Sequence, residues 1–147
     1  MVAPPGQDPL ETAAALDAAA GALLDVVARV HDGPDVPVPA TQLRALFILE
    51  RGPVNVSGLA AGLGALTSSA SRLCDRLEAS GLLRRDTGQD RREVTVRLTA
   101  DGRRLLERLR VRRREELGRI LSGMPAQARQ SLVWGLAEFS AAAGRHA

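Results

Sequence analysis

The sequence predicts a mainly α-helical protein with one small β hairpin. Apolar residues recur at helical spacing in six stretches, whereas strict alternation of apolar and polar residues marks a strand from Val94 to Leu98. Glycine and proline separate these stretches at short intervals, so the helices are expected to end sharply. The length of 147 residues suits a single domain. Three short helices precede the hairpin, and longer helices stand at both ends of the chain.

The first predicted helix runs from Leu10 to about Val30. Residues 1–9 contain three prolines and are expected to be disordered. The helix should end at the turn that begins with His31, and its many alanines suit close approach by another helix. This face is therefore a candidate for a dimer surface as well as for a core. Its apolar positions are Leu16, Ala20, Leu23, Leu24, Val27 and Val30.

Two short helices follow a proline-rich loop. Thr41 is the expected cap of the second helix, which should stop at Arg51. Ser57 is the expected cap of the third, and Gly64 can supply the positive φ that ends it. The apolar positions of the two helices are Leu43, Leu46, Phe47, Leu49, Leu59, Ala60 and Leu63.

The fourth helix and the hairpin form one continuous pattern. Thr67 or a neighbouring serine should start the helix, and Gly81 should close it. Residues 82–85 and 93–98 are the predicted hairpin strands, and residues 54–56 could pair with them as a third strand. Helix, turn, helix and hairpin in this order are the plan of a winged helix-turn-helix. The inward stripe of the fourth helix consists of Ala70, Leu73, Cys74 and Leu77.

The last two helices are separated by a break at Gly123–Met124–Pro125. Thr99 should open the fifth helix, which runs to about Ser122. Arg112–Arg114 interrupt its apolar side and are expected to face water, phosphate or acids of a partner chain. Trp134 in the sixth helix is interpreted as an interface or core anchor. The first and sixth helices carry more apolar surface than one small lobe needs. The apolar positions of the sixth helix are Leu132, Val133, Leu136, Phe139 and Ala143.

Charge is distributed unevenly along the chain. Residues 1–50 carry seven acids and two arginines, a net charge of −5, whereas residues 51–119 carry nine acids and sixteen arginines, a net charge of +7. A basic middle behind an acidic start favours a surface that binds a polyanion. Solvated helix faces are the alternative interpretation of the same charges.

The sequence argues against several classes of protein. Cys74 is the only cysteine, so no intrachain disulfide can form, and a reducing compartment is favoured. We find no membrane span and no secretory signal, so the cytoplasm is the expected location. His31 and His146 are the only histidines, and neither a metal site, a cofactor site nor a catalytic constellation is predicted. We therefore do not expect an enzyme.

The exposed side of the fourth helix has the residues that suit contact with DNA. A helix fits the major groove, and small hydroxyls near its start can bond phosphates or base edges. Arg72 is the best candidate for a bidentate contact with guanine. The predicted contact residues of this helix are Ser68, Ser69, Ser71, Arg72 and Arg76.

The hairpin tip carries a second set of candidates. Arg91 and Arg92 could reach the adjacent minor groove, whose negative potential is strongest at A·T tracts. Phosphate would repel Asp90, so its expected role is to hold a nearby guanidinium in position.

These residues resemble a known family. The run from Asp90 to Gly102 is similar to the wing signature of the MarR (multiple antibiotic resistance regulator) family, with an Asp-x-Arg tip, a Val-x-Leu-Thr strand end and a glycine shortly after. Residues 54–64 and 71–85 resemble the family's third and fourth helices. One departure is that Ala65–Leu66 stands where the family commonly has Ser or Thr, which moves the expected cap to Thr67.

The resemblance implies an obligate homodimer, a pseudo-palindromic operator and release by a small anionic or aromatic ligand. It assigns the minor-groove contact to Arg92. A ligand pocket would lie between the first, second and fifth helices, with Arg29, His31 and Arg44 as its polar lining. Residues 10–147 would form one domain, in which residues 41–98 are the DNA-binding lobe and residues 10–40 and 99–147 serve dimerisation.

The sequence thus predicts a homodimeric, sequence-specific DNA-binding transcriptional regulator, in the family more often a repressor. Two alternatives remain open. A protein-interaction module could keep the winged fold without binding DNA. A redox-responsive regulator could act through Cys74, although burial of this residue in the core is the simpler interpretation.

Overall fold

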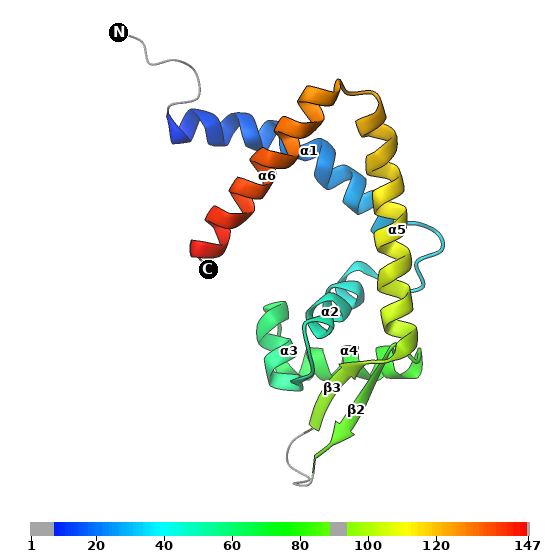
Figure 1. Cartoon of the computed structure of the whole chain (residues 1–147). Helices are drawn as coiled ribbons and strands as arrows, with labels where there is room; N and C mark the ends of the chain where they lie inside the picture. The colour runs from blue at the N-terminus through cyan, green and yellow to red at the C-terminus, as the bar shows by residue number, and fades with distance from the viewer. Residues whose placement is uncertain (1–7, 89–93, 147) are drawn as a thin grey trace. The chain divides into compact units, whose positions relative to one another are not determined.

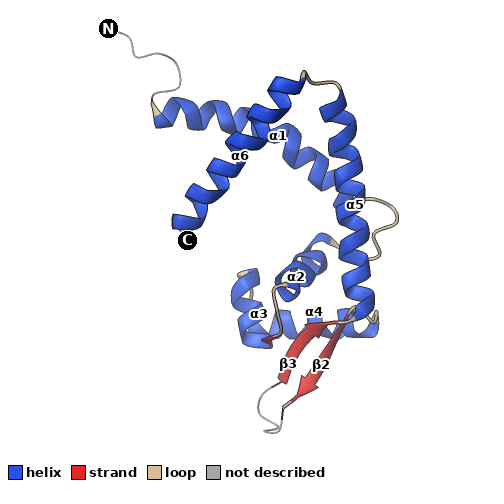
Figure 2. Ribbon diagram, viewed as in Figure 1, coloured by secondary structure: helices blue, strands red, loops and turns tan. Residues whose placement is uncertain are grey.

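The computed structural model describes residues 8–88 and 94–146. The chain divides into two compact units, residues 1–112 and residues 113–147, and each is described by itself (Figure 1). The predicted mixture of helices with one small sheet is confirmed (Figure 2). None of the described helices combines the length and the hydropathy that crossing a bilayer requires.

The first unit contains four complete helices, three strands and the start of a fifth helix. Helix α1 begins at Pro9, one residue earlier than expected, because the Asp8 carboxylate accepts a hydrogen bond from the Leu10 amide at 2.9 Å and caps it. The elements in chain order are α1 (Pro9–His31), α2 (Ala40–Glu50), β1 (Val54–Asn55), α3 (Val56–Leu63), α4 (Thr67–Ala79), β2 (Leu83–Thr87), β3 (Val94–Leu98) and α5 (Ala100–Ser122).

The three strands form one antiparallel sheet in the order β1-β3-β2. Val54 pairs with Val96, so the expected third strand is confirmed, although it spans only two residues and Val56 already belongs to α3. Leu83 pairs with Leu98 at the base of the hairpin. Strand β2 begins at Leu83 and extends to Thr87, so the expected strand over residues 82–85 was placed too early.

The core of this unit lies between the short helices, the sheet and the start of α5. The inward stripe predicted for α4 is confirmed, since Ala70, Cys74 and Leu77 are buried and Leu73 packs against the core partly buried. The largest fully buried side chains are Leu43, Leu46, Leu59, Leu77, Leu83, Leu105, Leu106, Val26, Val96 and Cys74. Burial on this scale fixes the orientation of α4 about its own axis, and with it the face that remains exposed.

The caps expected for α2 and α3 are wrong. Helix α2 begins at Ala40, its N-cap residue is Pro39 in an extended conformation, and Thr41 lies inside its first turn. The cap of α3 is Asn55, whose side-chain oxygen accepts a hydrogen bond from the Gly58 amide at 2.7 Å, so Ser57 lies within the first turn. Asparagine is an equally good cap, and its pairing in β1 places it at the helix start.

The junction between the hairpin and α5 is tightly packed. The Thr99 hydroxyl donates to the Gly81 carbonyl at 2.6 Å and accepts from the Gly102 amide at 3.1 Å, so Thr99 opens α5 as expected. Its amide donates to the Leu82 carbonyl at 3.2 Å. A Cβ atom on Gly102 would lie 2.2 Å from that same carbonyl oxygen. Only glycine fits at this position.

The second unit contains the remainder of α5 and helix α6 (Ala126–His146). The Arg129 guanidinium donates to the Leu121 carbonyl at 3.1 Å across the break between the two helices. None of residues 113–145 is buried. Trp134 is 68% exposed, so it is not a core anchor within this chain.

Candidate nucleic-acid interface

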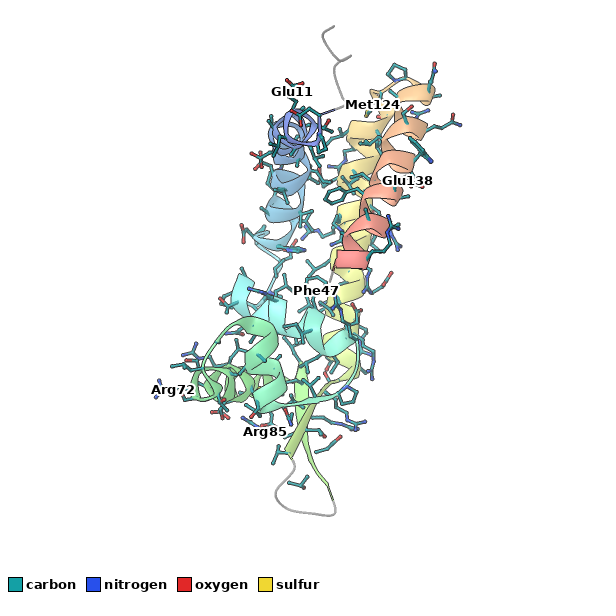
Figure 3. All side chains as sticks on the ribbon, turned by 90° about the vertical axis from the view of Figure 1, so that its left-hand side faces the viewer. Glu11, Phe47, Arg72, Arg85, Met124 and Glu138 are labelled. Carbon is teal, nitrogen blue, oxygen red and sulfur yellow. The ribbon has the colours of Figure 1, made fainter. Side chains whose placement is uncertain are left out.

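Helix α4 presents a polar face to solvent opposite its buried stripe. Ser68, Ser69, Arg72 and Arg76 are exposed, as the sequence predicts. Arg72 projects from the edge of the helical lobe in Figure 3. Two hydroxyls in the first turn and two guanidiniums in the next turns form a narrow donor-rich surface of the kind that can contact phosphates and base edges.

The start of α4 differs from the expectation. Leu66 is the N-cap residue, its side chain accepts no hydrogen bond, and Thr67 is the first helical residue, so the expected Thr67 cap is wrong. Leu66 is also 75% exposed. Leu66 therefore gives the first-turn amide groups of α4 no side-chain hydrogen bond, and a helix N-terminus favours an anion such as phosphate.

Ser71 departs from the rest of the predicted face, because it is half-buried. The guanidinium of Arg85, on β2, donates to the Ser71 carbonyl at 3.1 Å. The same guanidinium pairs with Asp75 and Glu78, each at 2.7 Å. Hydrogen bonds from Arg85 lower the pKa of Glu78, and the two carboxylates in turn raise the pKa of Arg85 against the effect of its burial. The sequence did not lead us to expect these ion pairs of Arg85 with Asp75 and Glu78.

Two sequence signals could have indicated these ion pairs. In β2 the side chain of residue 85 lies on the same face as Leu83, because alternate residues of a strand share a face. Asp75 and Glu78 are three residues apart on α4, so they share a helix face as well. A basic residue on the inner face of a strand beside two acids of a helix suggests an ion pair.

A hollow of about 370 Å³ lies beside the exposed face of α4. It is bounded by the start of α2, the turn after α3 and α4 itself. Its polar lining comes from Thr41, Gln42, Ser69, Arg72 and Arg76, and its apolar lining from Pro39, Leu63, Ala65, Ala70 and Leu73. The start of α2 therefore lies next to the predicted contact residues, which extends the candidate surface beyond α4.

The hairpin adds charge beside α4. On β2 and β3, Asp86 forms ion pairs with Arg84, at 3.5 Å, and with Arg97. Asp90, Arg91 and Arg92, the predicted tip residues, lie outside the described residues. Their contacts therefore stay predictions from the sequence.

The three residues predicted to line a ligand pocket lie in different environments. Arg29 and Arg44 are exposed, and His31 is half-buried. The His31 ring lies 5.5 Å from the ring of Phe47, centroid to centroid. His31 also lines a hollow of about 350 Å³ together with Val36, Pro39 and neighbouring residues of the α1–α2 loop. Of the three, only His31 lines this hollow.

Cys74 is fully buried, as the simpler interpretation of the sequence predicts. Desolvation raises the pKa of its thiol, an effect that outweighs the opposing charge of Arg85. A raised pKa reduces the fraction of reactive thiolate. The environment of Cys74 therefore favours a packing role over a redox role.

Three comparisons relate the chain to known proteins. Residues 36–93 match the sequence profile of the MarR family. The uncharacterized HTH-type transcriptional regulator YfiV of Bacillus subtilis (strain 168) is 33% identical over 110 residues, which cover 74% of this chain and 68% of that protein.

The same fold occurs in solved structures. The crystal structure of RV1404 from Mycobacterium tuberculosis has 32% sequence identity and a TM-score of 0.79, covering 95% of this chain and 97% of that one. BpsR of Bordetella bronchiseptica, whose DNA binding is regulated by 6-hydroxynicotinic acid, has 25% identity and a TM-score of 0.55, covering 84% of this chain and 96% of that one.

Proposed function

This chain belongs to the MarR family of transcriptional regulators, and on that premise we propose that it is a homodimeric repressor which binds a pseudo-palindromic DNA operator. Residues 41–98 form its DNA-binding lobe, and residues 10–40 and 99–147 serve dimerisation. It acts in the cytoplasm and has no catalytic activity.

The observation that carries this proposal is the exposed polar face of α4. Burial of Ala70, Cys74 and Leu77 turns Arg72 and Arg76 outward, next to a helix start without a side-chain cap. In the proposed complex α4 lies in the major groove. Arg72 makes a bidentate contact with guanine, while Ser68, Ser69 and Ser71 contact phosphates or base edges near the helix start.

The hairpin tip supplies the second contact. The connection between β2 and β3 carries Asp90, Arg91 and Arg92, and the Asp-x-Arg pattern is shared with the family's wing. Arg92 enters the minor groove beside the α4 site, Arg91 contacts phosphate, and Asp90 holds a guanidinium in position. Major-groove and minor-groove contacts then come from one lobe.

Dimerisation is supported by apolar residues that this chain leaves uncovered. Large patches of this kind on a soluble protein mark sites of association. A second copy that covers them gives the two-fold symmetry which a pseudo-palindromic operator requires. The exposed apolar residues of the end helices are Leu10, Leu16, Leu23 and Leu24 on α1 and Leu132, Val133, Trp134, Leu136 and Phe139 on α6.

A small anionic or aromatic effector releases the repressor in this proposal. The regulation of BpsR by 6-hydroxynicotinic acid supports an effector of that class. The hollow beside His31 is the candidate site. Arg29 and Arg44, which do not line it, are the proposed charged partners of the effector. Isothermal titration with aromatic carboxylates tests this proposal, and Arg29→Ala and Arg44→Ala variants should weaken any binding that is found.

The test of DNA binding is a mobility-shift titration against the promoter of the chain's own gene and against random DNA, across a range of salt concentrations. We expect preferential binding whose affinity falls steeply with salt, since phosphate contacts release counterions. No preference over random DNA would contradict the proposal and favour a protein-interaction module. In a parallel titration, peroxide should leave the affinity unchanged, and a loss of affinity would favour the redox alternative through Cys74.

A further inference from the structure

The guanidinium of Arg85, on strand β2, is bound to three residues of helix α4. It donates hydrogen bonds to Asp75 Oδ1 at 2.7 Å, to Glu78 Oε2 at 2.7 Å and to the Ser71 carbonyl at 3.1 Å. The Arg85 backbone amide donates to Glu78 Oε1 at 3.1 Å. The side chain is only 23% exposed, although it is charged. Strand and helix are thus joined by a charge-assisted cluster, which we call the Arg85 clamp.

The arrangement of the acceptors makes the clamp sensitive to the orientation of α4. Ser71, Asp75 and Glu78 are spaced four and three residues apart, so they follow one face of the helix over two turns. A guanidinium presents its donors in a rigid planar fork, so hydrogen bonds to three separate acceptors fix its direction as well as its distance. Rotation of α4 about its axis, or a slide along β2, would break several of these bonds at once.

The clamp includes the residue next to Arg72 in the proposed DNA-contacting face of α4. Ser71, whose carbonyl accepts from Arg85, is followed immediately by Arg72, which is exposed and points outward. Figure 3 labels Arg72 and Arg85 in the same lobe. The clamp also joins α4 to the strand that leads into the hairpin tip. It therefore links the proposed DNA-contacting helix directly to strand β2 of the hairpin.

We infer that Arg85 is a positioning residue for DNA recognition, which holds α4 at one angle to the hairpin so that both contact the duplex in register. This inference rests on the proposed function. Arg85 is not assigned a contact with DNA, because its donors already bind Ser71, Asp75 and Glu78. Its effect should therefore appear in specificity, the ratio of affinity for the operator to affinity for random DNA, and not in affinity alone.

Three variants separate positioning from simple charge. Arg85→Met removes the donors and keeps the aliphatic stem. Arg84→Met is the matched control, since it causes the same change of charge one residue away, where the side chain is 61% exposed and pairs with Asp86 on its own strand at 3.5 Å. The double variant Asp75→Ala/Glu78→Ala removes both carboxylate acceptors of the clamp from the α4 side and changes the net charge in the opposite direction.

The experiment measures fluorescence anisotropy with a duplex selected by the wild-type protein and with a random duplex. We expect Arg85→Met and the double variant both to lower the specificity ratio roughly tenfold or more, the discrimination that one well-aligned base contact supplies. The double variant should nevertheless bind random DNA more tightly than wild type, because it loses two negative charges. Arg84→Met should weaken binding to both duplexes equally and leave the ratio unchanged.

A measurement on the free protein accompanies these titrations. Hydrogen exchange at the α4 amides should be faster in Arg85→Met than in wild type and unchanged in Arg84→Met, with circular dichroism confirming that each variant is folded. If Arg85→Met proves unfolded, the double variant carries the test.

The inference is overturned if the double variant keeps the wild-type ratio, if Arg84→Met lowers the ratio as much as Arg85→Met, or if exchange in α4 does not change when the clamp is opened. Each of these results leaves the proposed function intact. A wild-type protein that prefers no sequence over random DNA would instead refute the proposed function, and with it the role assigned to Arg85.

Discussion

Replacement of Gly102 by alanine should destabilise the protein through a clash that the chain cannot relieve locally. The new Cβ would lie 2.2 Å from the Leu82 carbonyl oxygen and 3.0 Å from a Leu98 methyl group. The first contact is with backbone, which cannot move aside as a side-chain end can. Helix α5 must therefore shift away from the segment that connects α4 to the hairpin.

The size of the effect follows from the contacts at this junction. Overpacking of a close site costs ~1–3 kcal/mol. A shift of α5 also weakens the hydrogen bond from the Thr99 amide to the Leu82 carbonyl, a loss of about 1 kcal/mol. We expect a total of about 2–4 kcal/mol, which lowers the melting temperature by roughly 6–12 °C in a chain of this size.

The assay is thermal and urea unfolding followed by circular dichroism, at one fixed protein concentration. Gly118→Ala on the same helix is the matched control, because nothing lies within 4 Å of its added Cβ. Alanine is the better helix former there by about 1 kcal/mol, so this variant should gain stability. Equal stability of the two variants, or a stabilised Gly102→Ala, would refute the clash.

Three further predictions concern charge, recognition and association. Hydrogen bonds from Arg85 lower the pKa of Glu78 in the folded state, so ionised Glu78 stabilises the fold above its unfolded pKa, and this stability is lost as the pH falls through the folded pKa. In urea unfolding between pH 6 and pH 3, Glu78→Gln should therefore lose less stability than wild type. An identical loss would contradict the ion pair. Arg72→Ala should relax specificity at one base pair per half-site, whereas Arg92→Ala should weaken binding broadly, with a bias at A·T-rich flanks; unchanged affinities of both would refute the docking. Trp134→Ala should raise the dimer dissociation constant in analytical ultracentrifugation, and an unchanged constant would place Trp134 outside the interface.

The periodic elements could be predicted because burial depends on local patterns. The inward stripe of α4 follows from helical spacing alone, and the pairing of Val54 with the hairpin follows from alternation and length. Gly64 was predictable as a helix end, because its φ of 64° lies where glycine is favoured.

Helix starts were harder to predict, because several residues in a row can cap. Asn55, and not Ser57, caps α3, since its place in β1 brings it to the helix start. Leu66 precedes α4, although a threonine stands next to it. At α3 the two candidate caps, asparagine and serine, have nearly equal capping free energies, whereas at α4 the helix starts behind a leucine, which is a poor cap.

Local patterns could indicate an ion pair between Arg85 and the acids of α4, but not the full clamp with the Ser71 carbonyl. A long arginine side chain can turn to solvent or to any acid within reach, and the partners of Arg85 lie 7 to 14 residues earlier in the chain. Exposure of Arg72 and Arg76, by contrast, follows directly from the helical period and was predicted.

The most direct test of the account is selection of bound sequences from random duplex DNA by the wild-type protein. We predict an enriched inverted repeat whose half-site centres lie about 10 base pairs or a multiple of that apart, as two symmetric lobes on one face of the duplex require. Recovery of no enriched sequence, or of a single site without two-fold symmetry, would contradict a dimer that reads an operator through α4.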